Sequence, residues 1–326
     1  MRALLCKTLG GGPADMAVEE VEEPEPQAGE IIIRVKAVGL NFFDTLIIVG
    51  KYQYRPAPPF SPGAEVSGIV TRVGGGIAGF AKGDRVMAFT GWGGAREQVA
   101  VKAARVVAMP ENAGFETAAA MQVTYGTSFH ALKDRAALSA GETLAVLGAA
   151  GGTGQAAVEL GKLMGARVIA VASSDEKLEF CKSVGADHVI NSTSEDVRER
   201  IKALTEGRGA DVIYDPVGGN LSESAFRAIG WGGRYLVIGF ASGDIPRLPL
   251  NLPLLKGAAA VGVFWGEHVE REPEQHKTNM ESLVRWLADG SIRPRIDRSF
   301  PLNEAAVAFA AIARREIKGK AVLRLG

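Results

Sequence analysis

Over the first 110 residues, short β-branched segments of partly alternating polarity are separated by turns rich in glycine and proline. Three of these segments, Glu30–Val38, Glu65–Val73 and Asp84–Phe89, are predicted strands, because β-branched residues and alternation favour extended chain. Turn sequences such as Val73-Gly-Gly-Gly76 and Pro56-Ala-Pro-Pro59 keep the strands short. Short strands with this spacing predict a small, partly open β-barrel.

The pattern changes near residue 115. Glu116–Lys133 is alanine-rich and helical in character, and apolar strand-like runs then alternate with helical segments. Such alternation predicts a parallel sheet with helices on both faces. The predicted strands are Thr143–Leu147, Ala166–Ala172, Asp187–Ile190, Asp211–Tyr214, Arg234–Gly239 and Ala258–Trp265. The predicted helices are Gln155–Met164, Asp175–Val184, Glu195–Thr205 and Leu221–Ile229.

The tail, Pro273–Gly326, contains two further helical stretches and ends in a strand-like run, Gly319–Leu325, that is able to return to the first domain. With 326 residues, the chain is longer than one ordinary hydrophobic core requires. We therefore expect an α/β protein of two domains.

Composition and charge narrow the function classes. Hydrophobic residues make up 47% and charged residues 23%, as in ordinary soluble globular proteins. The 37 basic and 37 acidic side chains cancel, which argues against nucleic acid or a membrane as partner. Only Ala3–Cys6 separates Arg2 from Lys7, so no secretory segment is expected, and we expect a cytoplasmic protein. The two cysteines form neither a disulfide framework nor a metal motif.

The strongest local signal is a buried strand, a small-residue loop and a helix in succession over Thr143–Gln155. A dinucleotide phosphate needs close backbone approach and free N–H groups at a helix start. Ala149 replaces the first glycine of the usual pattern, so the strand before the loop and the helix after it carry the prediction. The alternative is a small-residue turn without a ligand. The predicted cofactor-binding residues of the loop are Ala150, Gly151, Gly152, Thr153 and Gly154.

The end of the next strand indicates which dinucleotide is bound. NAD enzymes usually place a carboxylate there for the ribose 2′-OH. This chain has Ser173, and Lys177 follows one helical turn later. A hydroxyl and an ammonium suit a 2′-phosphate, so we expect NADPH (NADP⁺) as cofactor. Asp175 is either a displaced ribose carboxylate or a helix N-cap.

Several motifs together resemble the medium-chain dehydrogenase/reductases, and within that family the zinc-free, zeta-crystallin-like quinone oxidoreductases. The motifs are Gly39–Thr45 with Gly50–Tyr52, Pro62–Gly68, and Gly148–Gly154 with Ser173–Lys177. The resemblance covers essentially the whole chain. It implies a GroES-like β-barrel catalytic domain over residues 1–123, completed by residues 264–326. It also implies a doubly wound Rossmann domain with a parallel sheet over residues 124–263, which binds NADPH.

The resemblance also indicates whether the chain can bind a catalytic zinc ion. Zinc alcohol dehydrogenases of the family have Cys-x-x-Asp where this chain has Asn41-Phe-Phe-Asp44, and Gly-His-Glu where it has Gly63-Ala64-Glu65. Their third ligand falls near Val123. A catalytic zinc needs about three protein ligands, so we expect no metal. Without a Lewis acid, the acceptor must already be activated, as a quinone or an alkene conjugated to a carbonyl is.

Three residues are candidates for both catalysis and cofactor contact. The Asn41 amide is a partner for the nicotinamide or the substrate oxygen, or else a loop side chain bonded to its own backbone. Tyr52 matches a cofactor-contacting tyrosine of zeta-crystallin-like enzymes and, by spacing, the catalytic tyrosine of enoyl-thioester reductases. The alternative for Tyr52 is packing on the Pro56–Pro59 loop. The resemblance places Thr127 near the nicotinamide, whereas His130 is expected to be a core residue.

Two later segments are also expected to contact the cofactor. Gly239, Phe240 and Ala241 follow a strand of the parallel sheet at its carboxyl end, where ligands bind in such sheets. Val263, Phe264 and Trp265 are a second cofactor candidate, with core or dimer packing as the alternative for the two aromatic residues. The strand near residues 258–265 reads as a sheet edge, so we expect a homodimer paired there.

These observations predict an NADPH-dependent reductase that passes a hydride to a quinone without metal. An enoyl-CoA or enone reductase is the enzymatic alternative. An NADPH-binding structural protein, as crystallin relatives suggest, is the alternative from another class.

Overall fold

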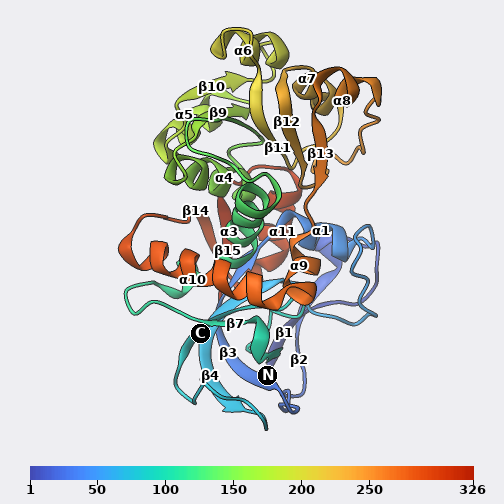
Figure 1. The fold of residues 1–326 in the computed structure, drawn as a ribbon. Coiled ribbons are helices and arrows are strands. Elements are labelled where there is room, and N and C mark those ends of the chain that lie inside the picture. The colour runs from blue at the N-terminus through green and yellow to red at the C-terminus, as the bar shows by residue number, and fades with distance from the viewer. The chain divides into compact units, whose positions relative to one another are not determined.

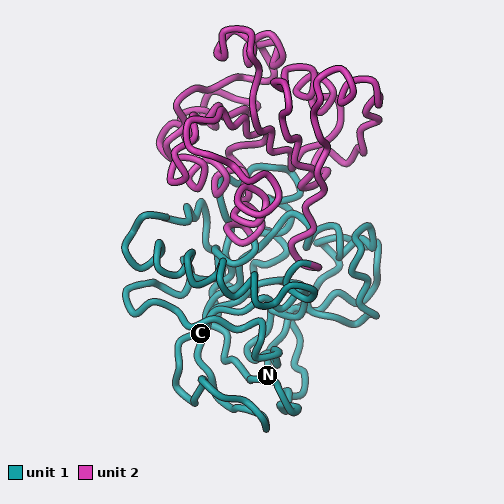
Figure 2. The backbone as a smooth tube through the Cα atoms, in the orientation of Figure 1, with its two compact units in different colours: residues 1–123, 268–326 teal, residues 124–267 magenta.

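The computed structural model describes residues 1–326, and the chain divides into two compact units. Unit 1 comprises Met1–Val123 and His268–Gly326, and unit 2 comprises Thr124–Glu267 (Figure 2). Each unit has its own sheet and hydrophobic core. No helix of the chain combines the length and the apolar character needed to cross a membrane.

Unit 1 is built on a seven-stranded sheet with the order β14-β15-β3-β4-β5-β7, in which β6 also pairs with β3, beside a two-stranded sheet β1-β2 (Figure 1). Its strands are β1 (Arg2–Cys6), β2 (Met16–Glu20), β3 (Glu30–Leu40), β4 (Glu65–Val73), β5 (Arg85–Phe89), β6 (Gln98–Lys102), β7 (Val106–Ala108), β14 (Ile296–Pro301) and β15 (Lys320–Arg324). The long strand β3 pairs with β4, β6 and β15, so it organises the sheet. The predicted return of the tail is confirmed by β15, which runs antiparallel to β3 with Val322 opposite Gly39.

The helices of unit 1 are α1 (Phe42–Ile48), α2 (Phe115–Ala119), α10 (Pro273–Asp289) and α11 (Ala305–Ala313), and the sequence predicted only some of them. α2 and α11 contact this sheet, and α1 contacts α11. The single helical stretch expected over Glu116–Lys133 is wrong in detail. It consists of α2, then α3 (Gln122–Phe129), and then a wider π-helical turn over His130–Arg135.

Unit 2 is a parallel six-stranded sheet with the order β10-β9-β8-β11-β12-β13, which confirms the predicted alternation. Its strands are β8 (Thr143–Leu147), β9 (Arg167–Ala172), β10 (His188–Asn191), β11 (Ala210–Asp215), β12 (Ile229–Val237) and β13 (Ala259–Gly262). The chain leaves β8 first toward β9 and later toward β11. Because such crossovers are right-handed, the two directions place helices on opposite faces of the sheet.

The helices of unit 2 correct the prediction at three places. α4 (Gly152–Leu163) begins inside the glycine-rich loop, earlier than expected. α8 (Asn251–Lys256) was not predicted, and the last strand stops at Gly262, so that Trp265 begins α9 (Trp265–Arg271). The other helices are α5 (Asp175–Val184), α6 (Val197–Leu204) and α7 (Asn220–Arg227).

Candidate active site

The loop between β8 and α4 has the geometry of a phosphate-binding loop. β8 is buried along its whole length and is followed by Gly148, whose φ of 57° favours glycine. α4 then starts at Gly152, and no side chain caps its first turn. The N–H groups of a first helical turn have no partner inside the helix, so they can bind an anion.

Close packing explains the last glycine of this loop. A Cβ on Gly154 would lie 2.3 Å from the carbonyl oxygen of Gly148, which is a clash with backbone. A Cβ on Gly151 would lie 3.4 Å from the same oxygen, so packing alone does not require glycine there. Gly151, Gly152 and Thr153 are half-buried, whereas Ala150 and Gly154 are buried. The five predicted residues therefore span the end of the loop and the first turn of α4, and the middle three reach the surface.

A buried tyrosine anchors the start of α4. The Ser128 hydroxyl donates to the carbonyl oxygen of Thr153 at 2.9 Å, and the Ser128 and Tyr214 hydroxyl oxygens are 2.9 Å apart. Burial raises the pKa of Tyr214, so its phenol stays neutral. These contacts tie α3 and β11 to the phosphate loop.

Ser173 and Lys177 lie together after β9. The Lys177 ammonium donates to the Ser173 hydroxyl at 3.5 Å, and Ser173 is exposed. The N-cap of α5 is Ser174 rather than Asp175, which corrects one of the two interpretations of that carboxylate. Asp175 instead accepts a hydrogen bond from the Asn191 amide at 2.8 Å.

Asp215, at the end of β11, organises two loops at the carboxyl edge of the sheet, and the sequence reasoning missed it. One carboxylate oxygen accepts the N–H groups of Val217 and Gly218 at 2.7 and 2.9 Å, and the other accepts the hydroxyls of Ser222 and Tyr235. An acid directly before Pro216-Val-Gly-Gly219 was the available signal.

The predicted loop Gly239, Phe240 and Ala241 lies beside this segment. It follows β12 and is half-buried throughout. The Ala241 N–H donates to the Pro216 carbonyl at 3.0 Å, which joins the loop to the chain after Asp215.

Val263, Phe264 and Trp265 take three different positions. The Val263 N–H donates to Val237 at 3.0 Å and the side chain is buried, whereas Phe264 is 44% exposed. Trp265 is buried against α3, because a Cβ on Gly126 would lie 2.7 Å from its indole. Core packing, the alternative reading of Trp265, fits this contact, although cofactor contact by these residues stays a prediction.

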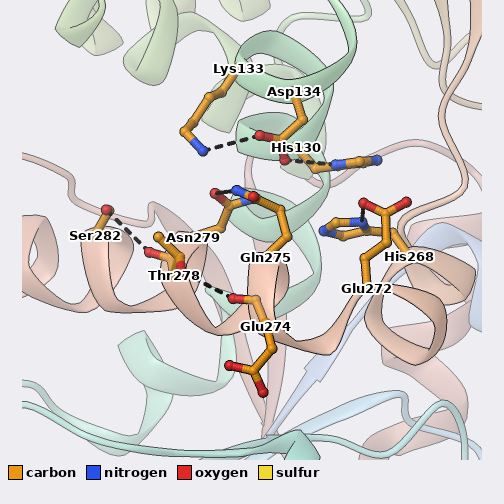
Figure 3. A network of polar contacts seen from close by, with 10 residues as sticks. All are labelled: His130, Lys133, Asp134, His268, Glu272, Glu274, Gln275, Thr278, Asn279 and Ser282. Carbon is orange, nitrogen blue, oxygen red and sulfur yellow. Dashed lines mark hydrogen bonds and ion pairs between the residues drawn. The ribbon is translucent and has the colours of Figure 1, made fainter.

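Thr127 follows Gly126 on α3 and is half-buried. His130, one turn later, is buried, and its Nδ1 lies 2.9 Å from Asp134, which also pairs with Lys133 (Figure 3). The expectation that His130 is a core residue with satisfied polar atoms agrees with this geometry.

In unit 1, four polar residues form a buried cluster, referred to below as the polar cluster: Asn41, Asp44, Glu65 and Lys320. The Lys320 ammonium donates to Asn41 Oδ1 and to Glu65 Oε1, both at 2.7 Å. The Asn41 amide donates to Glu65 Oε1 at 3.0 Å, and Glu65 Oε2 accepts the Val123 N–H at 2.9 Å. Lys320 is only 2% exposed and Glu65 fully buried, so this is an ion pair removed from water.

Asp44 completes the cluster from the first turn of α1. Its carboxylate accepts the backbone N–H of Asn41, the N-cap, at 2.8 Å. Complete burial raises the pKa of Asp44 to about 7, opposed by the Asn41 N–H and the Lys320 ammonium and assisted by the Glu65 charge. Asp44 therefore serves both as part of the helix cap and as a buried hydrogen-bond acceptor.

Asn41 is therefore bonded mainly within unit 1. Its Oδ1 accepts Lys320, and its amide donates to Glu65 and, at 3.3 Å, to the Gly39 carbonyl. Sequence reasoning missed Lys320. The available signal was a lysine inside the apolar run of the returning strand, Gly319–Leu325.

Tyr52 is half-buried and stacks on Phe43, with ring centroids 5.1 Å apart. Burial, with smaller contributions from Tyr54 and Asp44, raises the pKa of Tyr52 above its usual range. Tyr52 therefore stays a neutral phenol that is able to donate a hydrogen bond.

Comparison with known proteins agrees with this geometry. Residues 27–111 match the alcohol dehydrogenase GroES-like domain, and residues 152–286 match the family described as zinc-binding dehydrogenase. The chain is 36% identical to quinone oxidoreductase-like protein 2 homolog of Nematostella vectensis over 99% of its own length and 88% of the relative's. It is 31% identical to the quinone oxidoreductase of Rattus norvegicus, over 100% and 98% of the two chains.

Two solved structures resemble the whole chain. Escherichia coli quinone oxidoreductase complexed with NADPH is 27% identical with a TM-score of 0.94, over 100% of both chains. The CurK enoyl reductase is 26% identical with a TM-score of 0.91, over 100% of this chain and 99% of that one.

The zinc implied by one family description does not fit the residues present. The family's ligand positions hold an amide at Asn41 and aliphatic side chains at Ala64 and Val123, whereas zinc requires thiolate, imidazole or carboxylate ligands. The ammonium of Lys320 already lies 2.7 Å from both Asn41 and Glu65, where it would repel a divalent cation.

Proposed function

The chain belongs to the medium-chain dehydrogenase/reductase superfamily, in its quinone oxidoreductase branch, and we propose that this oxidoreductase transfers a hydride from NADPH to a quinone without metal. The observation that carries the proposal is the polar cluster. A lysine ammonium is bonded to Glu65 and to Asn41, and Asn41 occupies a position that holds a metal ligand in the zinc enzymes of the family. An acceptor reduced there must already be electron-poor, as a quinone is.

Three features of unit 2 support NADPH as the hydride donor. The uncapped start of α4 offers N–H groups to a pyrophosphate, and Gly151, Gly152 and Thr153 are accessible there. Ser173 and Lys177 offer a hydroxyl and an ammonium to a 2′-phosphate. The similar Escherichia coli enzyme is complexed with NADPH.

When bound, NADPH supplies the hydride, and the quinone gains this hydride and one proton to become a hydroquinone. The protein contributes mainly position and a controlled electrostatic environment. In our proposal, Asn41 and Tyr52 face the acceptor, and Thr127 lies beside the nicotinamide. Tyr52 donates a hydrogen bond to the reduced oxygen, since its phenol stays protonated.

We propose the domain roles accordingly. Residues 1–123, completed by 264–326, carry the acceptor-side residues, and residues 124–263 bind the cofactor. Gly239, Phe240, Ala241, Val263, Phe264 and Trp265 are proposed as further cofactor contacts.

The test is loss of NADPH absorbance with a panel of acceptors. We expect turnover with 1,4-benzoquinone and 9,10-phenanthrenequinone, and no oxidation of ethanol with NADP⁺, whether or not zinc is added. The proposal fails if both quinones are inert while zinc-supplemented enzyme oxidises the alcohol.

Reduction of a conjugated alkene is the second candidate, favoured by the similarity to the CurK enoyl reductase. Crotonyl-CoA distinguishes the two activities. Turnover of crotonyl-CoA that is lost in Tyr52→Phe, with quinone turnover unchanged, would support the conjugated alkene as the substrate class.

We also propose a homodimer paired through residues 258–265. β13 is an edge strand, and Ala259, Ala260 and Gly262 on it are exposed. Large apolar side chains are exposed on the neighbouring elements of unit 2, namely Trp231, Leu250, Leu254 and Leu255. An edge strand beside an apolar surface favours pairing with a second copy.

A further inference from the structure

Two loops of unit 2 meet at the carboxyl edge of its sheet, one after β9 and one after β10. The two strands are paired in parallel, and their last residues, Ala172 and Asn191, lie opposite each other. α5 begins after the first loop and contacts both strands (Figure 1). The first loop carries Ser173, and the first turn of α5 carries Asp175 and Lys177. The chain therefore has a carboxylate within the short segment that we propose for the 2′-phosphate.

A carboxylate in this segment affects the choice of cofactor in two ways. A carboxylate that faces the ribose accepts a hydrogen bond from the 2′-OH of NADH. The same carboxylate repels the 2′-phosphate of NADPH, because both groups are anionic. An Asp175 side chain that turned toward Ser173 would therefore favour NADH over NADPH.

In the structure, the Asp175 carboxylate is instead bonded to the end of β10. Its Oδ1 accepts the side-chain amide of Asn191 at 2.8 Å. Thr193 fixes the orientation of this amide, because its backbone N–H and its hydroxyl both donate to Asn191 Oδ1, at 3.1 and 2.7 Å. A backbone N–H is only a donor, so the amide oxygen must face Thr193 and the NH₂ group must face Asp175.

The backbone of Asn191 is held as well. Its N–H donates to a carboxylate oxygen of Glu195 at 2.8 Å, and its carbonyl accepts the Glu195 N–H at 2.9 Å. The Thr193 hydroxyl oxygen also lies 3.4 Å from the Ser173 carbonyl oxygen, next to the first loop. Asn191 is half-buried, whereas Asp175 is exposed. The amide is thus a donor that is already oriented, and Asp175 binds to it at little further entropic cost.

We propose that Asn191 determines cofactor specificity by position. Its amide holds the Asp175 carboxylate at β10 and so leaves the space beside Ser173 and Lys177 to the 2′-phosphate of NADPH. The inference rests on the proposed binding of this phosphate by Ser173 and Lys177. Asn191 is a positioning residue, since it acts through Asp175. NADH does not benefit from this arrangement, because its 2′-OH lacks a carboxylate partner.

Fluorescence titration with NADPH and with NADH tests the role of Asn191. In Asn191→Ala the Asp175 carboxylate loses its partner. We expect the Kd for NADPH to rise about threefold to tenfold, as for a like charge that comes within a few ångströms of the phosphate near the protein surface. The Kd for NADH should not rise. Asp175→Asn alone should bind NADPH at least as tightly as wild type.

A double variant distinguishes this positioning from a structural effect on the loop. Asn191→Ala combined with Asp175→Asn lacks the carboxylate that Asn191 restrains, so the ratio of the Kd for NADH to the Kd for NADPH should return at least to the wild-type value. A loop that had only become loose would not recover the ratio through the second substitution. Glu179→Gln, which removes another acid from α5, serves as control and should leave both Kd values unchanged.

The titration contains no acceptor, so it separates this inference from the proposed reaction. A fall of the ratio in Asn191→Ala that the double variant reverses would support the role of Asn191 even if every quinone were inert. An unchanged ratio in Asn191→Ala, or a lowered ratio that Asp175→Asn does not restore, would overturn it.

Discussion

At the scale of single residues, the least expected side chain is Lys320, because an ammonium with so little exposure is stable only when its charge is compensated. Glu65 provides the charge and Asn41 a second acceptor. The partners lie 255 and 279 residues earlier in the chain. No spacing rule connects positions so far apart, which is why the sequence predicted Asn41 as a site residue and not the group that fixes its amide.

Removal of one charge from this pair should be severe. We expect Lys320→Met to lose about 3–5 kcal/mol of unfolding free energy, since Glu65 would remain buried and uncompensated. Urea unfolding measures the loss. Lys320→Met combined with Glu65→Gln should recover much of it, and Lys102→Met, at the exposed end of β6, serves as control. A Lys320→Met protein as stable as wild type would contradict the buried pair.

The raised pKa of Asp44 predicts how the free energy of unfolding depends on pH. Its pKa is about 7 in the folded chain and about 4 in an unfolded chain, so the folded state holds a proton that the unfolded state has lost between these values. Stability should therefore fall as pH rises from about 4 to 7, by up to about 1.4 kcal/mol per pH unit.

Asp44→Asn isolates that contribution, because an amide oxygen can still accept the Asn41 N–H. Unfolding free energies of both proteins, measured from pH 5 to 8, should diverge with wild type losing more. Parallel curves would show that the Asp44 carboxyl does not titrate in this range.

At the scale of elements, the sequence was most reliable for the parallel sheet. Buried strands such as β8 appear in the sequence as short apolar runs between glycines, and few structures other than a buried strand fit such a run. It was less reliable where the same apolar pattern fits both a helix and a strand. The only polar residues of α1, Asp44 and Thr45, are both buried, so no exposed polar face indicates a helix. The apolar run after residue 257 continues through β13 to Trp265, the first residue of α9, before charged residues begin at Glu267.

Substitutions at two glycines of the phosphate loop should distinguish an effect on packing from an effect on cofactor binding. Gly154→Ala forces a Cβ to within 2.3 Å of the Gly148 oxygen, so it should lower both the thermal midpoint and NADPH affinity. Gly151→Ala, with 3.4 Å to the same atom, should leave the midpoint unchanged and still weaken NADPH binding by about tenfold or more, because the methyl group occupies space next to the phosphates. Scanning calorimetry and fluorescence titration measure the two effects. Unchanged NADPH affinity in Gly151→Ala would contradict the assignment.

The first turn of α5 should select between the two nicotinamide cofactors. Lys177→Ala should raise KM for NADPH about tenfold, through loss of a charged hydrogen bond to the 2′-phosphate, and leave KM for NADH almost unchanged. Steady-state kinetics with each cofactor test this. Lys182→Ala, on the same helix and exposed, is the control. An equal rise in KM for NADPH and for NADH would show that Lys177 does not bind the 2′-phosphate.

At the scale of the whole molecule, the sequence predicted both the barrel-like and the parallel sheet, together with the return of the tail. These features follow from the order of apolar and polar segments along the chain, which the sequence shows directly. The exposed apolar side chains on α8 and at Trp231 were not predicted, because a sequence does not show which leucines a fold leaves uncovered.

This surface carries a prediction about assembly. Trp231→Glu places a charge on the apolar surface beside β13 and should shift a dimer to monomer in light scattering coupled to size-exclusion chromatography. Trp92→Glu, on an exposed indole of unit 1, should not change the mass. A wild-type protein that is monomeric at every concentration would contradict the proposed pairing.

The position of β15 has a consequence for biosynthesis. Unit 2 is one continuous stretch of chain, whereas the sheet of unit 1 needs a strand synthesised after all of unit 2. Glu65 therefore leaves the ribosome long before Lys320, its partner in the ion pair, has been synthesised. We expect unit 2 to acquire its native structure first during translation. Unit 1, although most of it is synthesised earlier, should complete its sheet only after Lys320 has been added.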